Sequence, residues 1–335
     1  MKLVTFLAGA EQRIGALDVE RDRIVDFQAA SEALHGKANP DFRDMLALID
    51  GGPDALDAAR AAIKGAFEKA VSAALRRPDS VTLLAPVPQP RQMRDCLAFE
   101  QHYRQARAQA LKVRAATYAD PAAAAIELEK TGEFSIPEVW YQQPVYYKGN
   151  RFSVIGTGQD ILWPRYAERL DYELEYGVFI GKKGKNIKAA NARAHIFGYC
   201  IFNDISARDA QYKEYPVRLG PAKGKDFDTG NIMGPWLVTS DEMTDPYDLT
   251  MTGKINGEEW SRGHSGTMHH RFEAIIAHVS DEETLHPGEF LGSGTVGNGC
   301  GLELGRWLKD GDVIELEITG LGVLKNRIIR QPART

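Results

Sequence analysis

The chain has 335 residues and 43% hydrophobic content, which is enough for a sizeable core and one or two domains. Its net charge of −5 gives no indication of nucleic-acid binding. Three cysteines without a close-spaced pair argue against a disulfide framework or a structural zinc site. No segment approaches the roughly 20 apolar residues of a membrane helix, and the apolar run at the N-terminus is too short for a signal peptide. We therefore expect a cytoplasmic protein that binds neither membrane nor nucleic acid.

The first part of the chain predicts a small domain that contains strands, over residues 1–85. Short apolar runs at 2–7, 14–19 and 23–27 are separated by charged turns, which is typical of a β-meander. Apolar residues amid alanines then recur near helical spacing and predict a helix over 54–77.

A proline-rich stretch at 85–90 predicts an extended linker, which leads into a larger domain over 86–335. A basic helix is expected over 99–118, and the poorly periodic stretch 119–138 predicts a mobile segment. The expected strands lie at 145–147, 153–155, 172–180, 199–203, 236–239 and 251–256, the expected helices at 189–196 and 269–279, and the expected final β-hairpin at 313–319 and 323–329. Because strands do not alternate regularly with helices, this domain is predicted to be α+β and strand-rich.

Three carboxylates follow or interrupt apolar runs in the middle of this domain. On a strand, Glu173 and Glu175 would point to one face about 7 Å apart, where they repel each other unless they share a cation. Asp204 ends the apolar run 199–202, and a carboxylate at the end of a buried strand is costly unless it is paired or binds metal. A solvated strand face is the alternative for a lone Glu-x-Glu pair, and we assign the pair at 315 and 317 to solvent. The pattern at 173–204 favours a divalent metal site.

Two other patterns are rejected as functional sites. The stretch 292–297 fits G-x-G-x-x-G, but the sequence Asn-Gly-Cys-Gly that follows is not expected to open the helix that a dinucleotide site requires. His264, His269 and His270 gather near Glu273 without the spacing of metal ligands, and we expect them on the polar surface.

Several segments together resemble the fumarylacetoacetate hydrolase family. They are DYELE at 171–175, NDISARDAQ at 203–211, KGKDF at 223–227, GSGTVG at 292–297, LEL at 302–304 and LGVLKNR at 321–327. The resemblance covers roughly residues 85–330. It implies a catalytic domain built as a mixed β-sandwich or roll, behind a small N-terminal β-containing domain, and it implies a homodimer.

The resemblance also implies that Glu173, Glu175 and Asp204 bind a divalent metal. In members closest to fumarylacetoacetate hydrolase itself, a fourth carboxylate precedes a catalytic histidine by seven residues, and Asp95 has that position. Glu100 competes with it but lies at the start of the predicted helix, and a turn or cap role is the alternative for Asp95. Ligation by oxygen alone favours Mg²⁺, with Mn²⁺ or Ca²⁺ as alternatives.

By the same resemblance, His102 is the general base and Glu303 is the acid that orients it, although a lone histidine on a helix also fits a structural role. Lys225 is implied to be an electrophile beside the substrate, whereas Lys223 fits the surface. The further implied substrate contacts are Arg208, Gln211, Thr295 and Tyr147.

These residues predict a metal-dependent hydrolase that cleaves a C–C bond in a small 1,3-diketone or 2-oxo acid, such as an acylpyruvate or a fumarylacetoacetate-like compound. Related proteins on the same scaffold leave three alternatives open, which are a decarboxylase of oxaloacetate type, an isomerase and a lactonase. A binding protein that needs metal but does not catalyse is a further alternative. The presence of every candidate residue argues against it.

Overall fold

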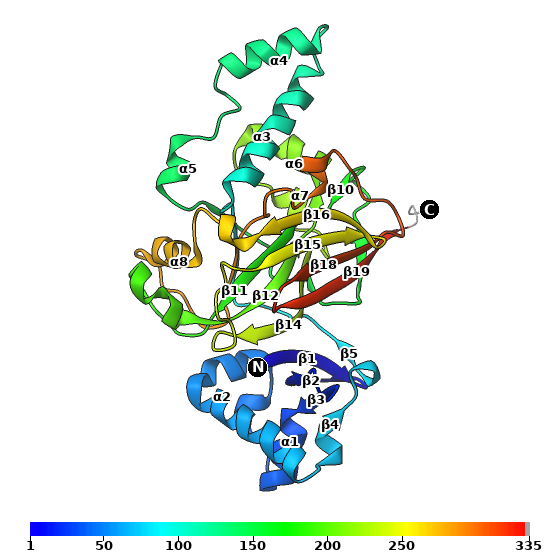
Figure 1. The fold of residues 1–335 in the computed structure, drawn as a ribbon, viewed down its shortest axis with the longest axis vertical. Coiled ribbons are helices and arrows are strands. Elements are labelled where there is room, and N and C mark those ends of the chain that lie inside the picture. Colours follow the sequence, from blue (N-terminus) through cyan, green and yellow to red (C-terminus); the bar gives the residue numbers. More distant parts are fainter. Residues whose placement is uncertain (332–335) are drawn as a thin grey trace.

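The computed structural model describes residues 1–331. Its N-terminal part is a small lobe below the rest of the molecule in Figure 1. The lobe contains β1 (Lys2–Ala8), β2 (Glu11–Asp18), β3 (Arg23–Asp26), α1 (Phe27–His35), α2 (Met45–Glu68), β4 (Leu75–Arg76) and β5 (Thr82–Leu83). The predicted meander is confirmed, because β2 pairs antiparallel with both β1 and β3.

The helix predicted over 54–77 is wrong at both ends. α2 already begins at Met45, and its helical geometry is interrupted at Gly52, whose φ is 61°. The helix ends at Glu68, and Leu75 and Arg76 instead form β4, which pairs with β3. Pairing with a strand some 50 residues earlier in the sequence therefore overrides the helical periodicity at this end.

A 12-stranded mixed sheet runs through both parts of the molecule. Its order is β4-β3-β2-β1-β14-β12-β11-β17-β6-β7, with β5 beside β1 and β8 beside β14. The strands not yet placed are β6 (Met93–Cys96), β7 (Tyr146–Lys148), β8 (Val154–Ile155), β11 (Leu174–Ile180), β12 (Ile196–Asp204), β14 (Asn231–Thr239) and β17 (Phe290–Gly292). Because β1 pairs with β14, the lobe and the larger part share this sheet, and the division into domains at 1–85 and 86–335 stays a prediction.

A second sheet of five strands has the order β16-β15-β18-β19-β9, and β10 and β13 form a separate pair. These strands are β9 (Asp160–Trp163), β10 (Leu170–Asp171), β13 (Ser206–Ala207), β15 (Thr250–Ile255), β16 (Glu258–His264), β18 (Val313–Ile318) and β19 (Gly322–Arg330). The predicted C-terminal hairpin is confirmed as β18 and β19. Tyr176 and Val178 of β11 share one buried core with Leu316 of β18, so the main core joins the two large sheets. The mixed α+β fold expected from the sequence is confirmed.

The basic helix expected over 99–118 is confirmed as α3 (Glu100–Ala115). No helix is predicted over 119–138, but the structure has α4 (Pro121–Lys130) there, with α5 (Glu138–Gln142) following. The side chain of Asp120 caps α4 by accepting hydrogen bonds from the backbone N–H groups two and three residues further along the chain. The proline that follows Asp120 begins the helix, a position where proline is favourable. Figure 1 shows α3 and α4 rising beyond the sheets as an arm, and movement of this arm stays a prediction.

The remaining helices are α6 (Arg208–Glu214), α7 (Ala222–Lys225), α8 (Phe272–Ser280) and α9 (Gly301–Leu304), and a 3₁₀ helix at Ala189–His195 stands where a helix is predicted. Among the described residues, no helix has both the length and the apolar character to cross a membrane.

Candidate active site

Three carboxylates from three strands meet in the interior and form what we call the carboxylate cluster. Asp95 lies on β6, Glu175 on β11 and Asp204 at the end of β12. Each is buried, and each offers an oxygen within 4.8 Å of the oxygens from the other two. Asp95 and Asp204 are 109 residues apart in the sequence, and the strand order brings them together because β6, β17, β11 and β12 are successive neighbours.

The carboxylate cluster carries more negative charge than its surroundings compensate. Burial, followed by the charge of Asp204, raises the pKa of Asp95 to about 8. Burial likewise raises the pKa of Asp204 to about 6 and that of Glu175 well above its usual value. Within residues 1–331, Glu175 Oε2 and Asp204 Oδ1 are buried and accept no hydrogen bond. An all-oxygen set with free buried acceptors fits a hard divalent cation, so a candidate acidic metal site is present.

Glu173 differs from these three carboxylates, because both of its oxygens are already used. Oε1 accepts a hydrogen bond from Arg208 Nη2 at 2.8 Å, and Oε2 accepts one from Lys225 Nζ at 2.6 Å. Burial alone raises the pKa of Glu173, but the charges of Lys225 and Arg208 outweigh burial and hold the pKa below its usual range. We call Asp171, Glu173, Arg208 and Lys225 the ion-pair cluster. Metal ligation by Glu173 stays a prediction, and it would compete with these hydrogen bonds for the lone pairs of the carboxylate.

Asp204 joins the two clusters. Its Oδ2 accepts a hydrogen bond from Lys225 Nζ at 2.5 Å and another from the Tyr147 hydroxyl at 2.5 Å. The nearby carboxylates overcome the effect of burial and raise the pKa of Lys225, so the ammonium stays charged. Burial, followed by the charge of Asp204, raises the pKa of Tyr147 well above its usual value, so the phenol stays neutral.

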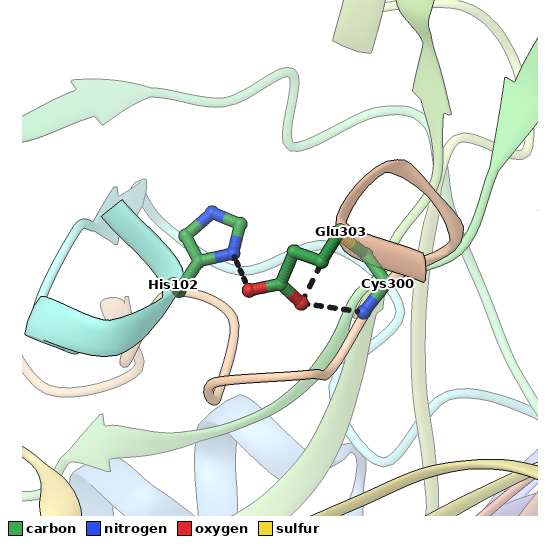
Figure 2. A group of neighbouring side chains, drawn as sticks. All are labelled: His102, Cys300 and Glu303. Carbon is green, nitrogen blue, oxygen red and sulfur yellow. Dashed lines mark hydrogen bonds and ion pairs between the residues drawn. The ribbon is translucent and has the colours of Figure 1, made fainter. Parts of the chain in front are cut away.

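The structure brings His102 and Glu303 together, although they lie 201 residues apart. His102 lies in the first turn of α3, and its Nδ1 is 3.1 Å from Oε1 of Glu303 on α9 (Figure 2). Glu303 Oε2 accepts a hydrogen bond from the backbone N–H of Cys300 at 3.1 Å, which fixes the carboxylate. The Glu303 side chain is 0% exposed and that of His102 is 8% exposed. With a proton on Nδ1 held by Glu303, the other ring nitrogen is free to accept a proton.

Two of the side chains implied to contact substrate form hydrogen bonds with residues of the two clusters. Thr295 donates from Oγ1 to Glu175 Oε1 at 3.1 Å, and Gln211 accepts at Oε1 from Arg208 Nη1 at 3.1 Å. Arg208 itself is held by carboxylates, and the contact of these side chains with substrate stays a prediction. Glu100, the competitor of Asp95, lies outside the carboxylate cluster and pairs with Arg104 on the surface of α3.

Asp171 is a residue to which the sequence assigned no role. Its Oδ2 accepts hydrogen bonds from Arg208 Nε at 2.9 Å and Nη2 at 2.7 Å. Its side chain also accepts from the backbone N–H groups of Gly301 at 2.7 Å and Leu302 at 3.0 Å. Asp171 therefore ties Arg208 to the start of α9, which carries Glu303. The only sequence signal was its place at the head of the DYELE motif, because its partners lie 37 and 130 residues away.

The two rejected patterns have structural explanations. The four-residue helix α9 begins only at Gly301, so no helix opens directly after residues 292–297. His270 Nε2 lies within hydrogen-bonding distance of the Trp140 carbonyl oxygen, and no histidine near Glu273 belongs to a metal-ligand group in the described part of the chain. His270 is buried, so the expectation that it lies on the surface is wrong.

Comparison with known proteins identifies the family. The model of the fumarylacetoacetate (FAA) hydrolase C-terminal family matches residues 97–329. The chain belongs to the fumarylacetoacetate hydrolase family. The proteins it resembles include a tautomerase, an isomerase and a hydrolase by name.

Among its relatives, the human mitochondrial oxaloacetate tautomerase FAHD2A is 36% identical over 189 residues, which is 56% of this chain and 60% of the relative. The match thus spans about three fifths of that relative's length. A fumarylacetoacetate hydrolase from Exiguobacterium antarcticum has a TM-score of 0.70 and 25% identity, with 99% of this chain and 100% of that chain covered. Maleylpyruvate hydrolase from Sphingobium sp. SYK-6, solved with manganese(II) and pyruvate, has the same fold, with a TM-score of 0.70, 21% identity and the same coverage.

Proposed function

We propose that this enzyme is a metal-dependent hydrolase that cleaves a C–C bond in a small 1,3-diketone or 2-oxo acid, such as an acylpyruvate. The observation that carries the proposal is the buried contact between His102 and Glu303. We call His102 and Glu303 the dyad. The backbone N–H of Cys300 donates to Glu303, and Cys300 pairs with Glu173 in an isolated β-bridge, so the dyad lies beside the two clusters. A candidate base, a fixed cation and the carboxylate cluster are therefore close together.

His102 acts as the general base in this proposal. Glu303 holds the proton on Nδ1 and stabilises the imidazolium that forms, so the other ring nitrogen takes a proton from water. The hydroxide attacks the substrate carbonyl, a C–O bond forms, and the C–C bond breaks with its electron pair leaving as an enolate. Protonation of the enolate completes one carboxylic acid and one ketone from one diketone and one water, and both products are acids when the substrate is a diketo acid such as an acylpyruvate.

Lys225 supplies positive charge for the oxyanion that develops during the attack. Its ammonium is buried and fixed by Glu173 and Asp204, so little reorganisation is needed when negative charge appears nearby. Gln211, held by Arg208, is the proposed neutral partner of the same oxyanion.

Asp95, Glu175 and Asp204 are the proposed metal ligands, with Glu173 as a further ligand if it gives up one ion pair. A divalent cation held there would supply Lewis-acid stabilisation of negative charge on the substrate oxygens. The all-oxygen donor set favours Mg²⁺, and the manganese(II) in the Sphingobium maleylpyruvate hydrolase supports a divalent ion of this kind.

Oxaloacetate tautomerisation is the second candidate, and the 36% identity to human FAHD2A favours it. The same dyad would then move a proton between carbon and oxygen of the substrate, without an attacking water. A tautomerase interconverts keto and enol forms and makes no second acid, so the products separate the two functions.

The test is turnover of a panel of acylpyruvates, fumarylpyruvate, fumarylacetoacetate and oxaloacetate, with Mg²⁺ or Mn²⁺ and with EDTA. Products are followed by mass, and keto–enol exchange by absorbance. The proposal expects two acids from one diketone, with formation stopped by EDTA. Faster ketonisation of enol oxaloacetate without cleavage of any diketone would replace it with the tautomerase function, and release of carbon dioxide from oxaloacetate alone would indicate a decarboxylase.

A further inference from the structure

A second group of potential metal ligands lies at the dyad itself, separate from the carboxylate cluster. His102, Cys300 and Glu303 each offer one ligand atom, and these atoms lie within 4.8 Å of one another. Figure 2 shows the three side chains converging from the first turn of α3 and from the start of α9. We call them the mixed-donor group.

The donors of this group differ in kind from those of the carboxylate cluster. Nitrogen, sulfur and oxygen face one another here, whereas the carboxylate cluster offers oxygen alone. Imidazole and thiolate select Zn²⁺ and similar borderline-soft ions, and Mg²⁺ prefers oxygen. We propose that the mixed-donor group binds Zn²⁺ and that this binding inhibits the enzyme, while the carboxylate cluster holds the metal used in catalysis.

The distances in the group are close to those a zinc ion requires. Zinc bonds of about 2.0–2.3 Å in tetrahedral geometry place neighbouring ligand atoms roughly 3.3–3.8 Å apart. His102 Nδ1 lies 3.1 Å from Glu303 Oε1, and Cys300 Sγ lies 3.5 Å from Glu303 Oε2. These two distances involve different oxygens of Glu303, so side-chain rotation must bring the three donors, which lie within 4.8 Å of one another, around one ion, with water as the fourth ligand.

Binding changes the protonation of the group and its hydrogen bonds. The Cys300 S–H bond breaks as the Zn–S bond forms, and its proton leaves to solvent. The proton on Nδ1 of His102 moves through solvent to the other ring nitrogen, so the lone pair of Nδ1 becomes free to bond the ion, and no oxidation state changes. Glu303 then bonds the ion and no longer holds the imidazole proton, so His102 loses the orientation that its role as base requires. The inhibition rests on the proposed function, whereas the binding does not.

The chain supplies a matched control for this site. Cys96 and Cys200 are also buried free thiols, but neither belongs to a group of potential metal ligands in the part of the chain that the structure describes. Cys200 lies within β12, 100 residues before Cys300 in the sequence. Cys200→Ala therefore removes a buried thiol without removing a donor of the mixed-donor group.

The binding test uses Co²⁺ as a spectroscopic substitute for zinc, added to the full-length protein saturated with Mg²⁺. We expect the near-ultraviolet charge-transfer band of a cobalt–thiolate bond in the wild type and in Cys200→Ala, and we expect Zn²⁺ to abolish it. The band should be absent in Cys300→Ser, and Cys300→Ala provides a second variant in case serine impairs folding. Absence of the band in the wild type, or its persistence in either Cys300 variant, overturns the proposal.

The inhibition test titrates Zn²⁺ against turnover at two Mg²⁺ concentrations. The zinc concentration for half inhibition should rise at least about tenfold in Cys300→Ser, because even residues outside the ligand shell change metal affinity by that factor. Each protein is compared with its own uninhibited rate. Excess Mg²⁺ should not relieve the inhibition. Inhibition that Mg²⁺ relieves and that Cys300→Ser leaves unchanged would place zinc at the carboxylate cluster and overturn the proposal. A cobalt–thiolate band without turnover of any substrate would contradict the proposed function and leave the binding site standing.

Discussion

Glu173 of the ion-pair cluster and Glu175 of the carboxylate cluster are the same chemical group in opposite electrostatic states. Glu173 and Glu175 are two residues apart and both are buried, yet the pKa of Glu173 is lowered and that of Glu175 is raised. Lys225 and Arg208 face Glu173, whereas Glu175 faces Asp95 and Asp204.

The difference shows that a motif of alternating glutamates does not define equivalent ligands. A carboxylate paired with two cations contributes to stability and is a poor ligand for a metal ion. A carboxylate among other carboxylates costs stability until a proton or a metal ion compensates it.

Glu173→Gln should destabilise the protein by roughly 3–5 kcal/mol, because it leaves the buried charges of Lys225 and Arg208 without one of their partners. Denaturant unfolding of the metal-free protein measures the change. A loss below about 1 kcal/mol would show that Asp204 and Asp171 compensate the two cations without Glu173.

Removal of metal should lower the stability of the wild type. A ligand at one hundred times its Kd stabilises the folded state by about 2.7 kcal/mol, so EDTA should lower Tm by several degrees. Differential scanning calorimetry with Mg²⁺, Mn²⁺ and EDTA measures the shift. Equal Tm values in all three conditions would argue against a bound cation at the carboxylate cluster.

Asp171→Asn should reduce kcat about 10- to 100-fold, roughly 1.4–2.7 kcal/mol, with a smaller effect on KM. Asparagine keeps the size of the side chain but weakens the hold on Arg208 and on the backbone of α9, so Glu303 is less firmly placed. Asp171→Glu is the companion variant, which keeps the charge but displaces it. If both variants lost stability while kcat was unchanged, Asp171 would have a structural role only.

Glu175→Gln should have the smallest effect on stability and the opposite sign to Glu173→Gln. It removes a buried carboxylate that has no compensating cation, so the metal-free protein should gain about 1 kcal/mol. The stabilisation by Mg²⁺ should be lost in the same variant, as measured by Tm with and without EDTA. Equal destabilisation by Glu175→Gln and Glu173→Gln would contradict the contrast between the two clusters.

The sequence predicted many of the residues at the candidate site but not the contacts among them. Short motifs identified Glu175, Asp204 and His102, because each motif is local. The ion pairs of Glu173 and the contacts of Asp171 join segments 35 to 131 residues apart, so no local pattern could reveal them. The mixed-donor group could not be predicted from cysteine spacing, because one cysteine provides its only thiol.

Local signals explain the outcomes in the fold as well. Alternation predicted β18 and β19, whose pairing is between neighbours in sequence. The C-terminal end of α2 was missed because β4 pairs with the distant strand β3. α4 was missed although its Asp120-Pro121 start is a local helix signal, since the surrounding sequence lacks a clear apolar stripe.

The most direct test of the proposed mechanism is a double-mutant cycle on His102→Ala and Glu303→Gln, with kcat measured on the best substrate from the panel. If Glu303 acts only by orienting His102, His102→Ala should reduce kcat about 10²- to 10⁴-fold, and adding Glu303→Gln should reduce it little further. Turnover near that of the wild type in His102→Ala, or losses that multiply in the double variant, would contradict a dyad that works as one unit.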